Sequence, residues 1–158
     1  MTHRDPDDQQ RDELLRQHAD EANRAMSDGD ARRAADAAAR VIDLLERAGA
    51  APDEGVLGWW AFRANALLEA DRFDEALVEL RRVLARRTAL SGPDARATLR
   101  VRADIVDAHR RAGRHTEALE LARGLLDDRR RVHGDDDPQT RRARQVVHEL
   151  EALADGDT

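Results

Sequence analysis

Apolar residues recur every three or four positions along most of the chain, and this spacing is typical of α-helices. The stretch from Ala76 to Leu84 is a clear example, because its apolar residues share one face of a helix. Glycine, proline and acidic residues interrupt the pattern at regular intervals, where one helix is expected to end and the next to begin. The pattern predicts helices over about residues 8–27, 30–48, 54–70, 73–90, 94–112, 115–133 and 138–154.

One short phrase occurs three times along the chain. DRFDEAL begins at Asp71, GRHTEAL begins at Gly113, 42 residues later, and GDARRAA begins at Gly29, 42 residues earlier. The segments GPDARATLR, from Gly92, and GDDDPQTRR, from Gly134, have the same separation. The chain therefore consists of repeated units. In each unit we expect two helices joined by a tight turn, with Gly29, Asp71 or Gly113 in the left-handed conformation that stops the first helix.

The repeated unit resembles the tetratricopeptide repeat (TPR), a helix-turn-helix unit whose usual length is about 34 residues. Its longer form, of 42 residues, is similar to the kinesin-light-chain-type repeats of bacterial proteins. The resemblance covers about residues 11–154 and is carried by Trp60, Ala64, Leu67, Asp71, Ala76, Leu80 and Val83, and by Ile105, Gly113, Ala118 and Leu125. The first helices depart from the family pattern, with Glu21 and Arg63 in place of Leu, and Ala25 and His109 in place of Tyr.

The resemblance implies an all-α fold, a right-handed α-solenoid of three TPR-like repeats with a C-terminal capping helix. We expect a single domain over residues 11–154, with a disordered or frayed N-terminus over 1–10 and a tail over 155–158. The repeats are expected at about 11–50, 54–92 and 94–134, the capping helix at 138–154, and the breaks between units at Pro52, Pro93 and Pro138. The capping helix carries Val146, Val147, Leu150 and Leu153 on one side.

Composition narrows the classes of protein that fit. The 158 residues are 41% apolar but only 3% aromatic, which favours closely packed helices, and all 27 basic residues are arginine. A formal charge of −6 disfavours nucleic acid and anionic lipid as partners. Cysteine is absent, which excludes disulfides, thiolate zinc sites and cysteine nucleophiles. The sequence shows neither the apolar segment of a signal peptide nor a membrane span, so we expect a cytoplasmic location.

In a stack of TPR-like units the first helices line a concave groove, where a partner is expected to bind. Helical geometry and the 42-residue repeat predict that this groove contains Arg16, Asn23, Asn65, Leu68, Arg100, Asp107 and Arg110. Asparagine pairs well with the backbone of an extended peptide, and arginine pairs with carboxylates. The predicted ligand is therefore a protein or peptide with an acidic or C-terminal carboxylate end. The alternative is that these polar residues form a solvated helix surface without a ligand.

The aromatic residues of VLGWWAF are expected to pack inside the protein. Trp60 is predicted in the core, and Trp59 and Phe62 against neighbouring helices, since three rings within four residues cannot share one face. The alternative is that Trp59 is an exposed anchor for a partner.

Catalytic and metal-binding signals are weak in this sequence. The segment HGDDD, from His133, has potential metal ligands, but acidic residues before Pro138 also suit the start of a helix. His148, in HEL, lacks the second histidine that a zinc protease helix requires. We therefore predict neither an enzyme, nor a cofactor, nor a metal. The runs Arg129–Arg131 and Arg141–Arg144 lie among acidic residues and indicate local ion pairs, with nucleic-acid binding as the alternative.

Two hypotheses for function follow from these observations. The first is a cytoplasmic interaction scaffold that holds a peptide or partner protein in the groove, without a cofactor. The second is a self-associating structural or assembly subunit that uses its terminal helices, for which Val147 and Leu150 are the positions to change.

Overall fold

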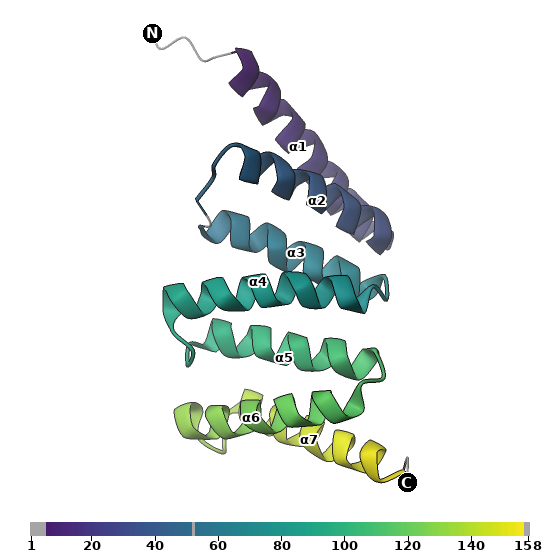
Figure 1. Cartoon of the computed structure of the whole chain (residues 1–158), viewed down its shortest axis with the longest axis vertical. Helices are drawn as coiled ribbons and strands as arrows, with labels where there is room; N and C mark the ends of the chain where they lie inside the picture. Colours follow the sequence, from purple (N-terminus) through teal and green to yellow (C-terminus); the bar gives the residue numbers. More distant parts are fainter. Residues whose placement is uncertain (1–5, 52, 157–158) are drawn as a thin grey trace. The chain divides into compact units, whose positions relative to one another are not determined.

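The computed structural model describes residues 6–51 and 53–156. These residues form α-helices joined by turns, with no strand in the part described (Figure 1). The all-α fold predicted from the sequence is therefore confirmed. The helices are α1 (Pro6–Ser27), α2 (Ala31–Arg47), α3 (Glu54–Glu69), α4 (Phe73–Ser91), α5 (Arg96–Arg111), α6 (His115–His133) and α7 (Pro138–Gly156).

The two terminal helices are longer than the sequence pattern indicates. Helix α1 begins at Pro6, so residues 6–10 are helical where a frayed end was expected. Proline suits the first position of a helix, and Asp7 and Asp8 in the first turn interact favourably with its dipole. At the other end α7 continues to Gly156. Residues 1–5, Pro52 and residues 157–158, for which an N-terminal end, a break and a tail were predicted, lie outside the described residues.

The turns inside the three repeats share one geometry. Gly29, Asp71 and Gly113 have φ angles of 78°, 58° and 74°, the left-handed conformation predicted for them. In each turn the next amide donates a hydrogen bond to the carbonyl five residues before it, at 2.8, 2.9 and 2.9 Å. These bonds satisfy carbonyl groups that the end of a helix leaves without a partner. The 42-residue register read from the sequence is thus present in the backbone.

The starts of the first helices also repeat, with one exception. Asp53 precedes α3 and its Oδ1 accepts hydrogen bonds from the amides of Gly55 and Val56, at 2.9 and 3.1 Å. Asp137 precedes α7 and accepts in the same way from the next two amides of that helix. Ala95, at the equivalent position before α5, has an extended backbone and no side-chain cap. The start of α5 therefore lacks a stabilising contact that α3 and α7 have.

Contacts between residues group the chain into two compact units. Unit 1 ends at Glu79 and unit 2 begins at Leu80, so the boundary falls inside α4. In unit 1, α2 packs between α1 and α3. Ala22, Ala37 and Ala38 form a core of small side chains there, and Trp59 and Phe62 pack against it. Their ring centroids are 5.4 Å apart in an edge-to-face arrangement. The predicted inward packing of the aromatic residues is confirmed, and Trp60 is buried.

In unit 2, α6 packs against both α5 and α7. Its core combines residues of all three helices: Leu99, Val106, Ala118, Leu119, Ala122, Leu125, Val147 and Leu150. The choice of Val147 and Leu150 as self-association positions was wrong, because both side chains are buried inside this unit. They face α6 because their apolar surface is the stripe that attaches α7 to the rest of unit 2.

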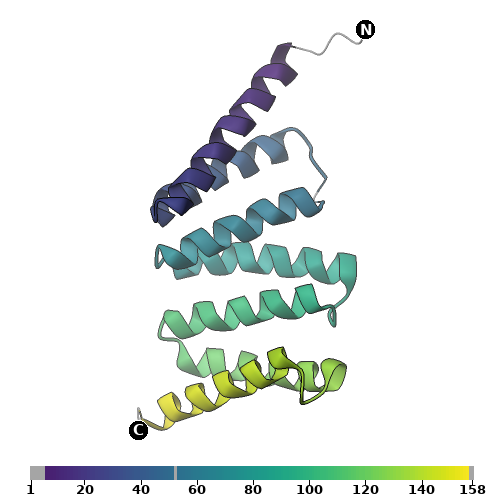
Figure 2. The same ribbon diagram turned by 180° about the vertical axis from the view of Figure 1, so that it is seen from behind.

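The outer face of α7 is polar where the corresponding face of α5 is apolar. In α5, Leu99 and Val106 belong to the core of unit 2 and Ala103 packs against it. The residues 42 positions later are Arg141, Gln145 and His148, all of which are exposed (α7 is drawn in yellow in Figure 2). A capping helix is expected to have such a polar surface, and the capping role of α7 stays a prediction.

Candidate functional site

The predicted groove residues of unit 1 lie on α1 and α3. Arg16, Asn23 and Asn65 are all exposed. The Arg16 guanidinium makes an ion pair with Glu13, at 3.3 Å, and its Nε donates to the carbonyl of Asp12. The polar side chains of Asn23 and Asn65 therefore lie at the surface, at equivalent positions of two repeats.

Leu68 differs from the expectation. Its side chain is only 6% exposed, so it does not form part of a binding surface. Helix α3 is apolar around much of its circumference and buries seven of its 16 residues, so it lacks the single exposed face that helical geometry assumed.

The predicted residues of unit 2 line one concave cavity. The unit-2 cavity has a volume of about 890 Å³ and lies among α5, α6 and α7. Arg100, Asp107 and Arg110 of α5 all line it, together with Arg142 of α7. Asp107 and Arg110 pair with each other at 2.5 Å, so each charge is partly compensated within its own helix. Arg100 has no ion-pair partner among the described residues.

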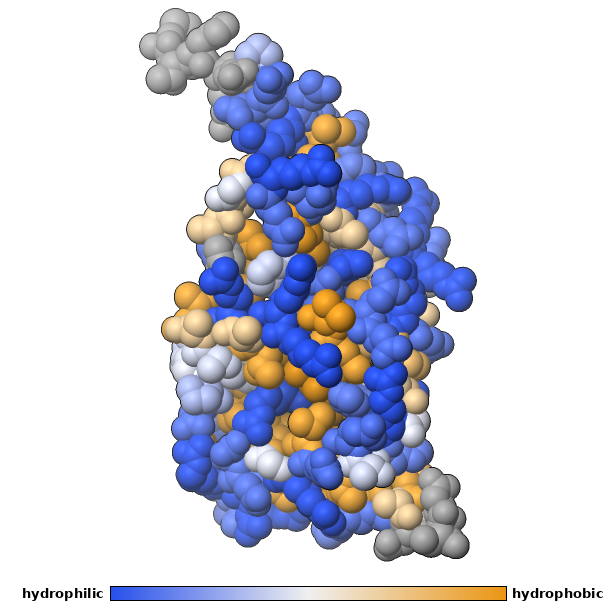
Figure 3. All heavy atoms as spheres, viewed as in Figure 1, coloured by the Kyte–Doolittle hydropathy of each residue, from blue (hydrophilic) through white to orange (hydrophobic). Residues whose placement is uncertain are grey.

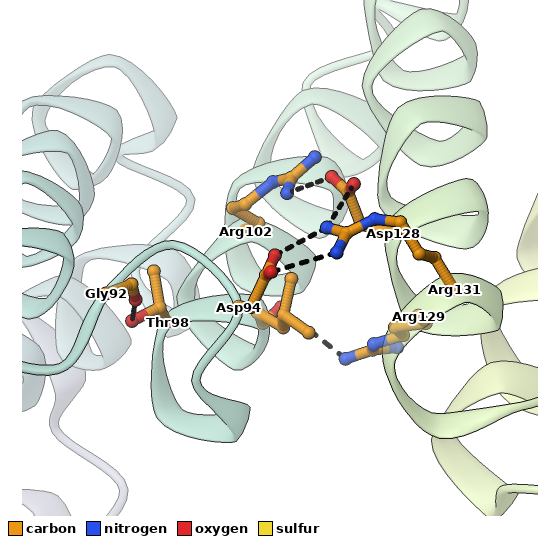
Figure 4. Close-up of polar contacts among 8 residues, drawn as sticks. Gly92, Asp94, Thr98, Arg102, Asp128, Arg129 and Arg131 are labelled. Atoms are coloured by element: carbon orange, nitrogen blue, oxygen red, sulfur yellow. Dashed lines mark hydrogen bonds and ion pairs between the residues drawn. The ribbon is translucent and has the colours of Figure 1, made fainter.

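Arg129 is a cavity residue that the sequence reasoning missed. It lies on α6 and is 5% exposed, although the run Arg129–Arg131 was interpreted as surface charge. Its Nη1 donates to the carbonyl of Gln139 at 3.0 Å and its Nη2 to the carbonyl of Leu99 at 3.5 Å. Figure 4 labels Arg129 on the same helix as Asp128 and Arg131. Burial lowers the pKa of Arg129 because the charged form loses hydration. The buried series Ala118, Ala122 and Leu125 leads to position 129 at helical spacing, which was the available signal.

The neighbouring arginines behave as the sequence indicated. Arg131 makes a bidentate ion pair with Asp94, at 2.9 and 2.6 Å, and also contacts Asp128 (Figure 4). Arg102 reaches Asp128 from α5, at 2.6 Å. These arginines hold the pKa values of Asp94 and Asp128 below their ordinary values. The interpretation of this basic run as local ion pairs is confirmed for Arg131.

The acidic run before α7 is occupied by contacts with arginine and backbone amides. Asp135 pairs with Arg130 and Arg144, at 3.0 and 2.6 Å. Asp137 pairs with Arg96 at 2.9 Å and caps α7, and its pKa is lowered mainly by Arg96. Across the described ranges 6–51 and 53–156, no group of three or more His, Cys, Asp and Glu residues is arranged to hold a metal ion.

Comparison with known proteins finds a match to one family. The tetratricopeptide repeat pattern matches residues 57–123, which include most of α3, all of α4 and α5, and the first part of α6. This part of the chain carries the tetratricopeptide repeat. A comparison with curated proteins gave no match.

Solved TPR structures share the fold at low sequence identity. The kinesin-light-chain-type TPR-like repeats of Podosopora anserina match with a TM-score of 0.68 and 17% identity, over 86% of this chain and 64% of theirs. Their Q17M variant matches with a TM-score of 0.69 at the same identity and coverage. BtubC (BKLC) from P. vanneervenii has a TM-score of 0.57 and 11% identity, over 91% of this chain and 66% of that protein. The chain thus spans a little under two thirds of the length of these structures, and the likeness supports an all-α helical-repeat solenoid fold.

The TPR match indicates a general function. TPR folds generally mediate protein–protein interaction and are typically not enzymes.

Hydrophilic side chains dominate the face seen in Figure 3, with hydrophobic residues in separate patches between them. Within the part of the chain that the structure describes, no helix combines the length and the apolar character needed to cross a membrane.

The departures of this TPR chain from the family pattern have structural counterparts. Glu21, in place of Leu, accepts a hydrogen bond from Arg33 at 3.1 Å on the surface of unit 1. Arg63, at the equivalent position 42 residues later, makes an ion pair with Glu79 of α4, whose side chain is 3% exposed. The same position in two repeats thus carries an exposed ion pair in one and a buried ion pair in the other.

Proposed function

We propose that the chain is a cytoplasmic interaction module that binds an extended peptide segment of a partner protein along the first helices of its repeats. The observation that carries this proposal is the exposure of Asn23 and Asn65 at equivalent positions on α1 and α3. An amide side chain offers two donors and one acceptor, which suits the alternating groups of a peptide backbone. Repetition every 42 residues would let successive asparagines meet successive parts of one extended peptide.

Basic residues of the first helices favour an acidic or C-terminal carboxylate end on that peptide. Arg16 and Arg100 are exposed and occupy equivalent positions two repeats apart. Arg100 has no ion-pair partner within the described residues, so its guanidinium is available to a carboxylate. Arg110 contributes less in this proposal, because Asp107 already pairs with it.

The experiment compares three baits in affinity capture from native lysate, read by mass spectrometry. The baits are the wild-type chain, the Asn23→Ala/Asn65→Ala variant and the Gln10→Ala/Gln17→Ala variant. Gln10 and Gln17 are exposed amides of α1 outside the predicted groove, so the third bait is a matched control. A partner that binds as proposed is recovered by the wild type and the control and lost from the asparagine variant.

The affinity for that partner is then measured with purified components. Loss of both asparagines is expected to weaken binding roughly tenfold or more, since each hydrogen bond contributes about 1 kcal/mol. Equal affinity of all three proteins would contradict the proposal.

Self-association is the second candidate function, and one observation favours it. Leu14 of α1 and Leu153 of α7 are large apolar side chains that are exposed on the terminal helices. Light scattering after size-exclusion chromatography of the wild type, Leu14→Glu and Leu153→Glu tests it. An oligomer that either substitution dissociates supports this function, whereas a wild-type monomer at high concentration rules it out.

A further inference from the structure

The unit-2 cavity concentrates arginines that have no carboxylate partner. Arg100, Arg129 and Arg142 all line it, and none of them makes an ion pair with a described residue. Several other arginines of unit 2 are paired with acids: Arg102 with Asp128, Arg123 with Glu151, Arg131 with Asp94, and Arg144 with Asp135. The chain carries a net charge of −6, so this local excess of positive charge does not follow from composition.

Arg129 is the cation for which the absence of a partner matters most. A buried charge is costly unless an opposite charge or several hydrogen bonds compensate it. Its side chain is 5% exposed, and only two of its five N–H groups donate, to the carbonyls of Gln139 and Leu99. The remaining donors therefore have capacity for a ligand in the cavity.

The acidic residues of the cavity make no ion pair with these arginines. Asp107 is paired with Arg110, and Glu149 accepts a hydrogen bond from Gln145 at 2.9 Å. Asp104 interacts electrostatically with Arg100 and Arg129 but makes no hydrogen bond with either of them, and burial raises its pKa above the ordinary value. The Nε2 atom of His133 is buried in the same cavity without a hydrogen-bond partner.

We propose that the unit-2 cavity binds a dianionic oxyanion of the kind that a phosphate monoester carries, with Arg129 as the buried anchor and Arg100 and Arg142 as its further ligands. A phosphate monoester carries a charge of about −1.5 to −2 at neutral pH and three acceptor oxygens. Arginine binds such groups through parallel N–H donors. Leu99, Val106 and Val146 also line the cavity and would contact the organic part of the ligand.

This site shares Arg100 with the proposed peptide surface, but it does not use Asn23 or Asn65. Those two residues lie in unit 1, whereas every residue of the cavity lies in unit 2. The Asn23→Ala/Asn65→Ala variant should therefore bind the oxyanion like the wild type. Failure of the proposed peptide function and failure of this site are distinguishable for that reason.

The test is an NMR titration of the full chain with O-phospho-L-serine, following backbone amides and arginine Nε–H groups. Unphosphorylated serine and acetate, added at matched ionic strength, serve as ligands that lack the dianion. We expect saturable shifts on α5, α6 and α7 with O-phospho-L-serine, and clearly weaker shifts with serine and acetate. Inorganic phosphate is titrated in parallel, and tighter binding of the phosphoserine would identify an ester as the preferred ligand.

Two arginine variants locate the binding. Arg142 is exposed, so Arg142→Gln should leave the fold intact and weaken binding roughly tenfold, as expected for the loss of a charge-assisted hydrogen bond. Arg123→Gln removes the same charge from α6 outside the cavity and should leave binding unchanged. Arg129→Gln should abolish binding, and its amide spectrum shows whether unit 2 remains folded.

Equal shifts with phosphoserine and acetate would overturn the proposal. So would equal weakening by Arg123→Gln and Arg142→Gln, because general electrostatic attraction would then account for the binding.

Discussion

The ion pair between Arg63 and Glu79 yields a quantitative test of how this fold is stabilised. The side chain of Glu79 is 3% exposed and that of Arg63 is 21% exposed, so the carboxylate depends on the protein for compensation of its charge. Substitution Arg63→Leu restores the residue that the TPR pattern prefers but leaves Glu79 buried without this cation. Breaking a buried pair by removing one partner costs about 3–5 kcal/mol. For a chain of this size such a loss corresponds to a decrease in Tm of roughly 6–20 °C.

The double variant Arg63→Leu/Glu79→Leu distinguishes the loss of one charge from the loss of both. Replacement of both members by apolar residues is expected to be neutral or stabilising, because neither charge then has to be desolvated. The assay is thermal and urea unfolding followed by circular dichroism at the helical band. The double variant should recover the Tm of the wild type or exceed it.

Glu21 offers a matched control, since it occupies the same repeat position. Its partners Arg33 and Arg40 are 62% and 56% exposed and can return to water, so Glu21→Leu should change the free energy of unfolding by less than about 1 kcal/mol. If Arg63→Leu costs no more than Glu21→Leu, the buried pair has no special role and the reasoning is refuted.

Further predictions concern one turn, one helix start and one acid. Gly113→Ala should destabilise the protein by about 1–2 kcal/mol, because the left-handed conformation is costly for a residue with a Cβ. Asp71→Gly at the equivalent turn should be neutral or stabilising. Chemical denaturation measures both changes. Ala95→Asp should stabilise α5 by about 1 kcal/mol by supplying the missing N-terminal cap, and an unchanged unfolding midpoint would argue against it. Burial raises the pKa of Asp104 above 3.8, so its ionisation begins to oppose folding once the pH exceeds about 3.8, and the whole penalty is present above the folded-state pKa. Asp104→Asn should therefore increase stability at neutral pH, and unfolding measured at several pH values should show this gain disappear below about pH 3.8.

The sequence was sufficient for features that depend on local chemistry. The turns at Gly29, Asp71 and Gly113 could be predicted because a left-handed residue between two helices has a strong sequence signature. The helices could be predicted because apolar spacing is a direct consequence of helical geometry. Asp137 was recognised as part of a helix start for the same reason, since the cap lies next to the amides it binds.

The sequence was insufficient to predict the burial of side chains that depends on packing among three helices. Leu68 was placed on an exposed face by geometry that considered one helix at a time, although α3 is buried around much of its circumference. Arg129 was assigned to the surface by its charge, although its position continues the buried stripe of α6. The charge of Arg129 indicates exposure and its helical spacing indicates burial. In the packing of α5, α6 and α7 the side chain is buried. The spacing of Asp107 and Arg110, three residues apart on one helix, is sufficient to predict their pairing.

The polar outer face of α7 has a consequence for how molecules of this kind meet one another. The end of a helical repeat array resembles the edge strand of a β-sheet, because each offers a template on which a further copy of the same element could add. Arg141, Gln145 and His148 occupy the positions that hold apolar residues in α5, so an added helix would have to desolvate two basic side chains and an amide. This face of α7 therefore disfavours the packing of a further apolar helix, in the way that lysines protect a sheet edge. Substitutions Arg141→Leu, Gln145→Ala and His148→Val would give this face the apolar residues that α5 has at the equivalent positions.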